Sequence, residues 1–480
     1  MKIKKIEIEN NSFFGNVVFD FTDENGQVYD NIVLAGENGC GKTQLLNLIY
    51  EFSTLPTGGK MSDEIRKFVV VLTQEELSVL VGNTSDLVNS NGEFEITQIF
   101  SARQNTWGRI KVKYLSIQAD GTNIFKNIDA YSLFEHEENK AIFKSLYSTV
   151  EINYNPEKTS RITSQELDED VKVSLRSGGD LATSVQQLLI DVQANDANEL
   201  HIWVDEHPGI APPPLVSSRR ITRFKNAFST VFDNLNYYKI ISVAGQKKVL
   251  FKKRDVEVDI SSLSSGEKQI VFRGAFLLKN QRSARGCTVL IDEPEISLHP
   301  TWQQKIFTYY QKLFIDDDIQ TSQILMATHS QYVLRSALEN RANTLIILMK
   351  HNSNGFQINR ITAPLVLPNV TSAELNYVAF NIISIDYHIA LYGYLQDKVA
   401  LTLNKSTCSL AECDTYIKQQ SCYDSTKHEK NFNYILYGQS HTDYTLPTYI
   451  RNAIDHPDSG RTYTNLELIC SINLLIELCR

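Results

Sequence analysis

The stretch Gly36-Glu-Asn-Gly-Cys-Gly-Lys-Thr43 fits the pattern G-x-x-x-x-G-K-[ST] and decides the fold class of this 480-residue chain. A short apolar run, Asn31-Ile-Val-Leu-Ala35, precedes it and predicts a buried strand. The residues from Gln44 to Phe52 follow with helical periodicity. Strand, glycine-rich turn and helix in this order bring backbone N–H groups to the start of a helix, where phosphate groups bind. The sequence therefore predicts an α/β fold, with a mixed sheet flanked by helices and a nucleotide site at this turn.

The residue types in this turn suit the binding of a nucleoside triphosphate. The glycines let backbone N–H groups approach phosphate oxygens closely. The ammonium group of Lys42 would reach the β and γ phosphates, and the hydroxyl of Thr43 would hold Mg²⁺. We therefore expect ATP and Mg²⁺ as cofactors, with the nucleotide held by Gly36, Asn38, Gly39, Gly41, Lys42 and Thr43.

A second motif, Thr288-Val-Leu-Ile-Asp-Glu293, is an apolar strand that ends in two carboxylates. In a parallel sheet the carboxyl end of such a strand lies beside the phosphate-binding turn. Asp292 would then bind the Mg²⁺ ion or its water shell, and Glu293 would act as the general base toward the attacking water. The alternative is a surface turn after a strand, with no chemical role.

Three further stretches, taken with these motifs, resemble a known family. Leu263-Ser-Ser-Gly-Glu267 is similar to the signature of ABC-type ATPases. Glu293-Pro-Glu-Ile-Ser-Leu-His-Pro300 resembles the segment after the catalytic glutamate in RecF-type and overcoming-lysogenization-defect ATPases, and Ala327-Thr-His-Ser330 resembles their switch histidine motif. The four motifs stand in the order of the family. The resemblance covers roughly residues 1–350, with a family-variable insert in the middle.

The resemblance implies an ABC ATPase head, a P-loop NTPase fold like that of SMC and RecF proteins, with a compact insert. In this family two heads enclose two ATP molecules, so we expect a homodimer formed through an ATP sandwich. Ser264, Ser265 and Gly266 of one head would meet the phosphate loop of the other. His329 would contact the γ phosphate and report its loss, as a second catalytic residue beside Glu293. The family's Q-loop glutamine has three candidates, which stay open: Gln98, Gln118 and Gln165.

Changes of pattern divide the chain into four parts. Residues 1–60 hold the N-terminal part of the head. Residues 61–237 form a mixed α/β insert without a sustained heptad repeat, which favours a compact lobe over a long coiled coil. Residues 238–365 hold the C-terminal part of the head, and residues 370–480 form an all-α domain. Within that domain, apolar residues three to four positions apart from Glu374 to Val399 predict one amphipathic face.

Composition predicts a cytoplasmic protein with no membrane segment, because no stretch approaches the roughly 20 apolar residues of a membrane helix. The formal net charge of -9 excludes a basic surface over the whole chain. A local patch could still bind DNA or RNA. The candidates are Arg219, Arg220, Arg223 and Lys225, whose charges a solvated helix face would explain equally well.

The seven cysteines are irregularly spaced, which argues against a disulfide framework and favours reduced thiols. A metal site at Cys408, Cys413 and Cys422 is the alternative, but no C-x-x-C pair accompanies them.

In the last part of the chain, Arg451-Asn452-x-x-x-His456 resembles the motif of HEPN ribonucleases, which cleave RNA without a metal. Asn452 and His456 are four residues apart and would share one helix face, and the long side chain of Arg451 could reach the same phosphate. Arg451 and His456 are thus candidate catalytic residues. Pro457 departs from many family members, since proline should end the helix there. In the alternative interpretation these residues cap or pair structurally in a partner-docking domain.

Three functions remain in competition. The first is an ATPase of anti-phage defence, similar to Septu-type, PARIS-type and retron-associated ATPases, that controls a toxic effector. That effector would be its own HEPN-like domain or a partner nuclease. The second is a RecF-like ATPase of DNA maintenance. The third is a scaffold in which ATP binding only sets assembly.

Overall fold

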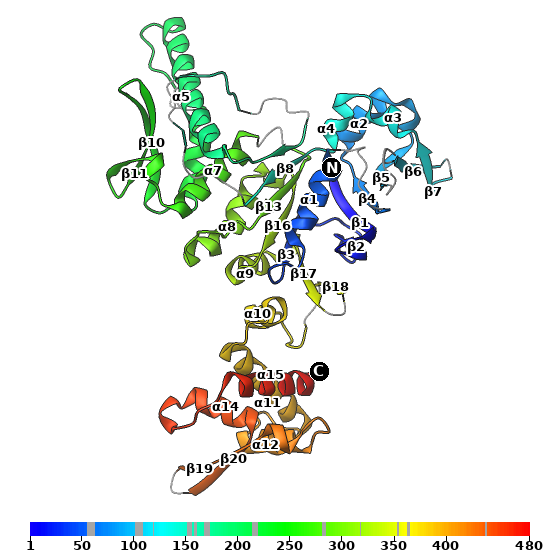
Figure 1. Ribbon diagram of the computed structural model, residues 1–480, viewed down its shortest axis with the longest axis vertical. Helices are drawn as coiled ribbons and strands as arrows, with labels where there is room; N and C mark the ends of the chain where they lie inside the picture. The colour runs from blue at the N-terminus through cyan, green and yellow to red at the C-terminus, as the bar shows by residue number, and fades with distance from the viewer. Residues whose placement is uncertain are drawn as a thin grey trace. The chain divides into compact units, whose positions relative to one another are not determined.

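The computed structural model describes the chain except for residues 55–62, 101–108, 119, 151–155, 158–160, 168–172, 214–218, 281–284, 317, 353–354, 362–364 and 437–438. The chain forms two compact units, residues 1–359 and residues 360–480. Figure 1 shows both units, and each has its own hydrophobic core.

The central sheet of the first unit has seven strands in the order β18-β17-β3-β16-β13-β8-β9. From β17 to β9 every neighbouring pair is parallel, so the carboxyl ends of these strands lie along one edge. The three central strands are buried at every position, as their continuous apolar sequences predict. The strands are β18 Gly355–Arg360, β17 Thr344–Asn352, β3 Asn31–Ala35, β16 Gln323–Thr328, β13 Thr288–Asp292, β8 Ser145–Ser148 and β9 Leu175–Arg176.

Four helices accompany this sheet and carry or support its motifs. Helix α1 packs against β8, β13 and β16, while α9 packs against β3 and β17. Helix α7 contacts β8, and α8 packs against α9. The helices are α1 Lys42–Ser53, α7 Ser265–Lys279, α8 Pro300–Lys312 and α9 Gln331–Glu339.

A second sheet of six antiparallel strands has the order β2-β1-β4-β5-β6-β7. Burial alternates along β4 and β5, so one face of this sheet joins the core of the unit. There, the ring of Phe52 on α1 stacks 3.8 Å from that of Phe68 on β4. The strands are β2 Gly15–Asp20, β1 Lys2–Asn11, β4 Ile65–Val71, β5 Ser90–Ile99, β6 Arg109–Ile117 and β7 Asn123–Ile128. Around it lie α2 Gln74–Asn83, α3 Ala130–Phe134 and α4 Glu137–Ile142.

The segment expected to be one insert, residues 61–237, is spread over several parts of the first unit. It extends the antiparallel sheet from β4 to β7 and adds β8 and β9 to the central sheet. Toward its end it forms the long helix α5, which contacts α6, α7 and β11 and stands at the upper left of Figure 1. A three-stranded sheet completes this region. The elements are α5 Leu181–Glu206, α6 Arg219–Ser229, β10 Leu235–Val243, β11 Gln246–Lys253 and β12 Val256–Asp259.

The described residues of the second unit form helices and a β-hairpin, so the expectation of an all-α domain needs correction. Strands β19 Glu429–Leu436 and β20 Gln439–Thr445 pair antiparallel between the helices. The helices are α10 Ser372–Phe380, α11 Ile385–Thr402, α12 Leu410–Gln419, α13 Ser425–His428, α14 Leu446–Asp455 and α15 Asn465–Cys479.

The continuous apolar face expected from Glu374 to Val399 is also wrong. Asn381 has a left-handed backbone, with φ of 53°, and caps the end of α10. A short link then leads to α11, and Ile382 and Ile385 on either side of the new start are exposed. The helical spacing of apolar residues continues from α10 into α11, although the chain leaves the helix between them, because both helices pack against the same core.

Candidate functional site

Three neighbouring parallel strands bring the sequence motifs to one edge of the central sheet. The order β3-β16-β13 places the glycine-rich turn after β3, His329 after β16 and the carboxylates at the end of β13. The register aligns Ala35 with Thr328, and Asp292 with Ala327. A pocket of about 310 Å³ opens there, lined by Asn38, Gly39, Gly41, Lys42, Thr43, Gln44, Glu293 and His329.

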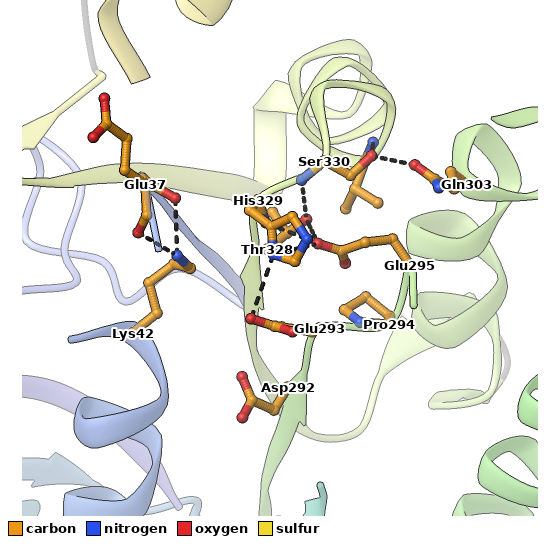
Figure 2. A network of polar contacts seen from close by, with 12 residues as sticks. Glu37, Lys42, Asp292, Glu293, Pro294, Glu295, Gln303, Thr328, His329 and Ser330 are labelled. Atoms are coloured by element: carbon orange, nitrogen blue, oxygen red, sulfur yellow. Dashed lines mark hydrogen bonds and ion pairs between the residues drawn. The ribbon is translucent and has the colours of Figure 1, made fainter. Parts of the chain in front are cut away.

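The glycine-rich turn depends on glycine at two positions. Gly36 has φ of 154°, and a Cβ atom there would lie 2.2 Å from the backbone oxygen of Met349. Gly41 has φ of 95° directly before α1, and its Cβ would lie 2.5 Å from the ring of Phe13. The buried ammonium group of Lys42 donates to the backbone oxygens of Gly36, at 2.8 Å, and Glu37, at 3.0 Å (Figure 2). The turn thus places a buried cation at the start of α1, where a phosphate group would bind.

The oxygens of Thr43 and Asp292 form a set that suits Mg²⁺. The hydroxyl of Thr43 donates to Oδ1 of Asp292 at 3.0 Å. Burial raises the pKa of Asp292 to about 6, although the Thr43 hydrogen bond acts in the opposite direction. A divalent cation would neutralise this buried carboxylate, and Mg²⁺ typically takes one or two protein oxygens together with substrate phosphates. The residues present therefore fit the ion.

Within the part of the chain that the structure describes, no three His, Cys, Asp or Glu side chains gather as a metal-binding group. The alternative of a metal site at Cys408, Cys413 and Cys422 is therefore not supported.

Glu293 and His329 face each other across the pocket. Nδ1 of His329 lies 3.3 Å from Oε1 of Glu293 (Figure 2). This hydrogen bond lowers the pKa of Glu293 and raises that of His329, in each case against the effect of burial. Glu293 also has a left-handed backbone, with φ of 42°. Such a conformation persists in a non-glycine residue only where its surroundings hold it.

The sequence pattern assigned no role to Glu295, whose side chain contacts His329. Its Oε1 atom accepts hydrogen bonds from the Thr328 hydroxyl and the His329 backbone N–H, both at 2.8 Å (Figure 2). Burial raises the pKa of its carboxyl group. The signal available in the sequence was a second glutamate two positions after the presumed base.

Arg273 on α7 was missed as well. Its guanidinium group is fully buried and binds Ser148 of β8 through Oγ at 2.8 Å and through the backbone oxygen at 2.9 Å. It also donates to the backbone oxygens of Asp292, at 2.7 Å, and Glu293, at 3.2 Å. One cation thus joins α7 to the carboxyl ends of two strands. A single arginine within the apolar run of residues 270–278 was the only hint in the sequence.

The residues of the signature start α7 and do not line the pocket of their own chain. Ser264 caps the helix in a capping box with Glu267, whose carboxylate also pairs with Lys253 at 2.7 Å. Ser264 and Ser265 are exposed. Gly266 is buried, and a Cβ atom there would lie 2.6 Å from the backbone oxygen of Ser297. Two serines and a helix N-terminus are therefore presented on the surface.

None of the three glutamine candidates lines the pocket. Gln98 is buried in β5, and Gln118 bonds to Ser116 in the turn after β6. Gln165 accepts a hydrogen bond from Lys279. Strand β8, the neighbour of β13, also ends at this edge of the sheet, and residues 151–155 beyond it lie outside the described part.

The basic residues at the start of α6 make contacts within the chain. Arg220 pairs with Glu199 at 2.6 Å and with Asp196 at 3.5 Å. Arg223 donates to the backbone oxygen of Leu278, and the ammonium group of Lys225 lies 5.8 Å from the ring centre of Tyr237. The side chain of Arg219 lies outside the described residues. These contacts weaken the case for a nucleic-acid patch.

In the second unit, Asn452 and His456, expected on one helix face, differ in their exposure. Pro457 ends the regular helix, so α14 stops at Asp455 and His456 is its exposed cap residue. Asn452 is buried, and the guanidinium group of Arg451 pairs with Asp455 at 2.7 Å. The helix thus ends before His456, and the pairing of Arg451 with Asp455 matches the structural alternative.

Comparisons with known proteins agree with the ATPase motifs. Residues 215–335, which include Ser264, Glu293 and His329, match the family model described as "AAA domain, putative AbiEii toxin, Type IV TA system". The chain is 22% identical over 397 residues to "Retron Ec83 probable ATPase" of Escherichia coli. The aligned region covers 69% of this chain and 69% of that protein.

Solved structures of SMC heads are similar at low identity. The SMC head bound to the C-winged helix domain of ScpA has 13% identity and a TM-score of 0.44, covering 75% of this chain and 98% of that chain. The SMC head domain from Thermotoga maritima has 11% identity and a TM-score of 0.36, covering 76% and 100%. In the described residues, no helix has the length and apolar character to cross a membrane.

Proposed function

We propose that this chain, an ATPase of the SMC/RecF/OLD-like ABC type, binds and hydrolyses ATP with Mg²⁺ between two copies of itself. In the proposed dimer, Lys42 and Thr43 hold the nucleotide and the ion, and Glu293 activates water. The ion would supply charge neutralisation at the phosphates. The observation that carries the proposal is the pocket in which Lys42, Thr43, Glu293 and His329 meet from three strands.

The proposed dimer is supported by the position of the signature residues, which do not line the pocket of their own chain. Ser264 and Ser265 are exposed at the start of α7, outside the pocket of their own chain. A helix N-terminus with capping serines is an anion site that a second molecule can use. We infer that the signature of one copy completes the phosphate site of the other.

We further propose that the ATP-driven dimer serves defence against phages by controlling a toxic effector from a partner protein. The support is the similarity to the retron-associated ATPase and to the family model that names a toxin. The chain's own second unit is not assigned a nuclease, because Arg451 and His456 are not assembled into a site.

Substitution of the base tests the central proposal. Glu293→Gln removes the base and keeps the shape of the side chain, so bound ATP should persist and hold two copies together. Light scattering after gel filtration in saturating ATP and Mg²⁺ should give a dimer for Glu293→Gln and a monomer for a Lys42→Ala control. A monomeric Glu293→Gln protein under these conditions would refute the sandwich.

DNA maintenance, the competing function, makes a different prediction. It requires ATP hydrolysis that duplex DNA stimulates, with a strong loss of stimulation as salt increases. A defence ATPase should instead reduce phage plating when expressed with its neighbouring genes, and Lys42→Ala should abolish that protection. DNA-stimulated hydrolysis without any protection would favour DNA maintenance.

A further inference from the structure

The carboxylate of Glu295 accepts a hydrogen bond from the backbone of the switch histidine, His329. Both hydrogen bonds to its Oε1 atom come from the carboxyl end of β16, one from Thr328 and one from the backbone N–H of His329. The side chain is 3% exposed and does not line the pocket, whereas that of Glu293 is 22% exposed and does. Glu295 therefore acts on the backbone next to the site and not on a ligand.

The ring of His329 lies between two carboxylates. Its Nδ1 atom is 3.3 Å from Oε1 of Glu293 and 3.5 Å from Oε1 of Glu295 (Figure 2). A ring nitrogen can donate only one hydrogen, so one carboxylate at a time can receive it. Whenever Glu293 turns toward a water molecule, Glu295 remains within reach of the ring.

The segment after His329 is fixed as well. The hydroxyl of Ser330 donates to Gln303 at 2.6 Å and accepts the backbone N–H of Tyr332 at the start of α9. With Glu295 on one side and Ser330 on the other, the backbone of His329 is anchored at both ends. The partly exposed ring is then the part of His329 left to move.

Stability alone does not explain a carboxylate at this position. Oε2 of Glu295 is buried and has no hydrogen-bond partner among the residues that the structure describes. A buried polar atom without a partner costs about 1–3 kcal/mol. An apolar side chain would avoid this cost but could not accept the two hydrogen bonds from Thr328 and His329.

We propose that Glu295 is a positioning residue for ATP hydrolysis, which keeps His329 aimed at the phosphate side of the pocket when Glu293 is released to activate water. This inference rests on the proposed ATPase function of the site. Glu295 does not line the pocket and acts only through His329.

A double-mutant cycle tests this role. Glu295→Ala should lower kcat about 10- to 100-fold, as misplacement of a reacting group does, with KM for ATP within about twofold of wild type. Glu295→Gln keeps an Oε1 acceptor and should restore kcat to within about threefold of wild type. His329→Ala should lower kcat similarly, and adding Glu295→Ala to it should lower kcat no further. Independent, multiplied losses, or an unchanged kcat in Glu295→Ala, would overturn the proposal.

A second measurement keeps the inference separate from the ATPase proposal and from misfolding. If the wild type does not hydrolyse ATP, the proposed function fails. The histidine ring can still be observed by NMR of nucleotide-free protein labelled at its 10 histidines. The His329 signal is identified by its loss in His329→Ala. Glu295→Ala should shift this signal and leave the other histidine signals in place, while Glu295→Gln should shift it less. An unmoved His329 signal, or a general change of all signals, would overturn the positioning role.

Discussion

Replacing Arg273 by methionine should weaken the first unit and slow ATP hydrolysis. Methionine fills a similar volume but has no donor and no charge. The backbone oxygens of Ser148, Asp292 and Glu293 would each lose a hydrogen bond from a guanidinium group that is fully buried. At about 1 kcal/mol for each, the lower end for a buried acceptor left unpaired, the free energy of unfolding should fall by about 3 kcal/mol.

The size of this loss translates into a measurable melting temperature. An unfolding entropy of about 2.1 cal/mol/K per residue over the 359 residues of the first unit gives about 0.75 kcal/mol/K. A loss of about 3 kcal/mol then lowers Tm by roughly 4 °C. The rate should fall too, because the backbone oxygen of Glu293 is one of the atoms that Arg273 holds, and this residue has a left-handed backbone.

The assay is thermal unfolding of Arg273→Met, Arg273→Lys and a matched control, together with ATP hydrolysis. Arg335→Met is the control, since Arg335 pairs with Glu339 on the surface of α9 and both side chains are more than half exposed. Such a pair contributes about 0.3–0.5 kcal/mol. Arg273→Lys keeps the charge with fewer donors and should lie between wild type and Arg273→Met. If Arg273→Met unfolds at the same temperature as Arg335→Met and hydrolyses ATP at the wild-type rate, the assigned role of Arg273 is wrong.

Four other substitutions give distinct expected results. Lys42→Ala should abolish ATP binding in a fluorescent-nucleotide titration without changing Tm by more than a few degrees. Gly266→Ala, which pushes a Cβ to 2.6 Å from the Ser297 oxygen, should leave ATP binding to the monomer intact but prevent the ATP-bound dimer in gel filtration. Burial raises the pKa of Asp292 from 3.8 to about 6. This group therefore lowers the free energy of unfolding of the nucleotide-free protein by about 3 kcal/mol as the pH rises through that window. Asp292→Asn should therefore unfold at a higher temperature than wild type at pH 8 and at the same temperature near pH 4. His456→Ala, at an exposed position, should change neither Tm nor any growth arrest on expression; new RNA ends that disappear in this variant would restore the ribonuclease hypothesis.

The sequence alone predicted the proposed nucleotide site to the extent that its parts are continuous in the chain. A phosphate-binding turn needs glycines, a lysine and a hydroxyl within eight consecutive positions, from Gly36 to Thr43, because backbone N–H groups must surround the phosphates. A buried parallel strand ending in Asp292 and Glu293 is likewise a local pattern, since both faces of such a strand are covered. These patterns predicted that Lys42, Thr43 and Glu293 lie close together, and the three residues line one pocket.

Only the tertiary structure decided what depends on contacts between distant segments. Arg273 contacts the backbone of Glu293 because α7 packs against β8, the neighbour of β13, and no residue adjacent to Arg273 in the chain predicts this contact. Glu295 meets His329 because β16 lies next to β13. In the second unit, a four-residue spacing predicted that Asn452 and His456 share a face, but the helix ends before His456. Residue spacing defines a helix face only within a continuous helix. Packing and backbone chemistry, here that of Pro457, decide where the helix ends.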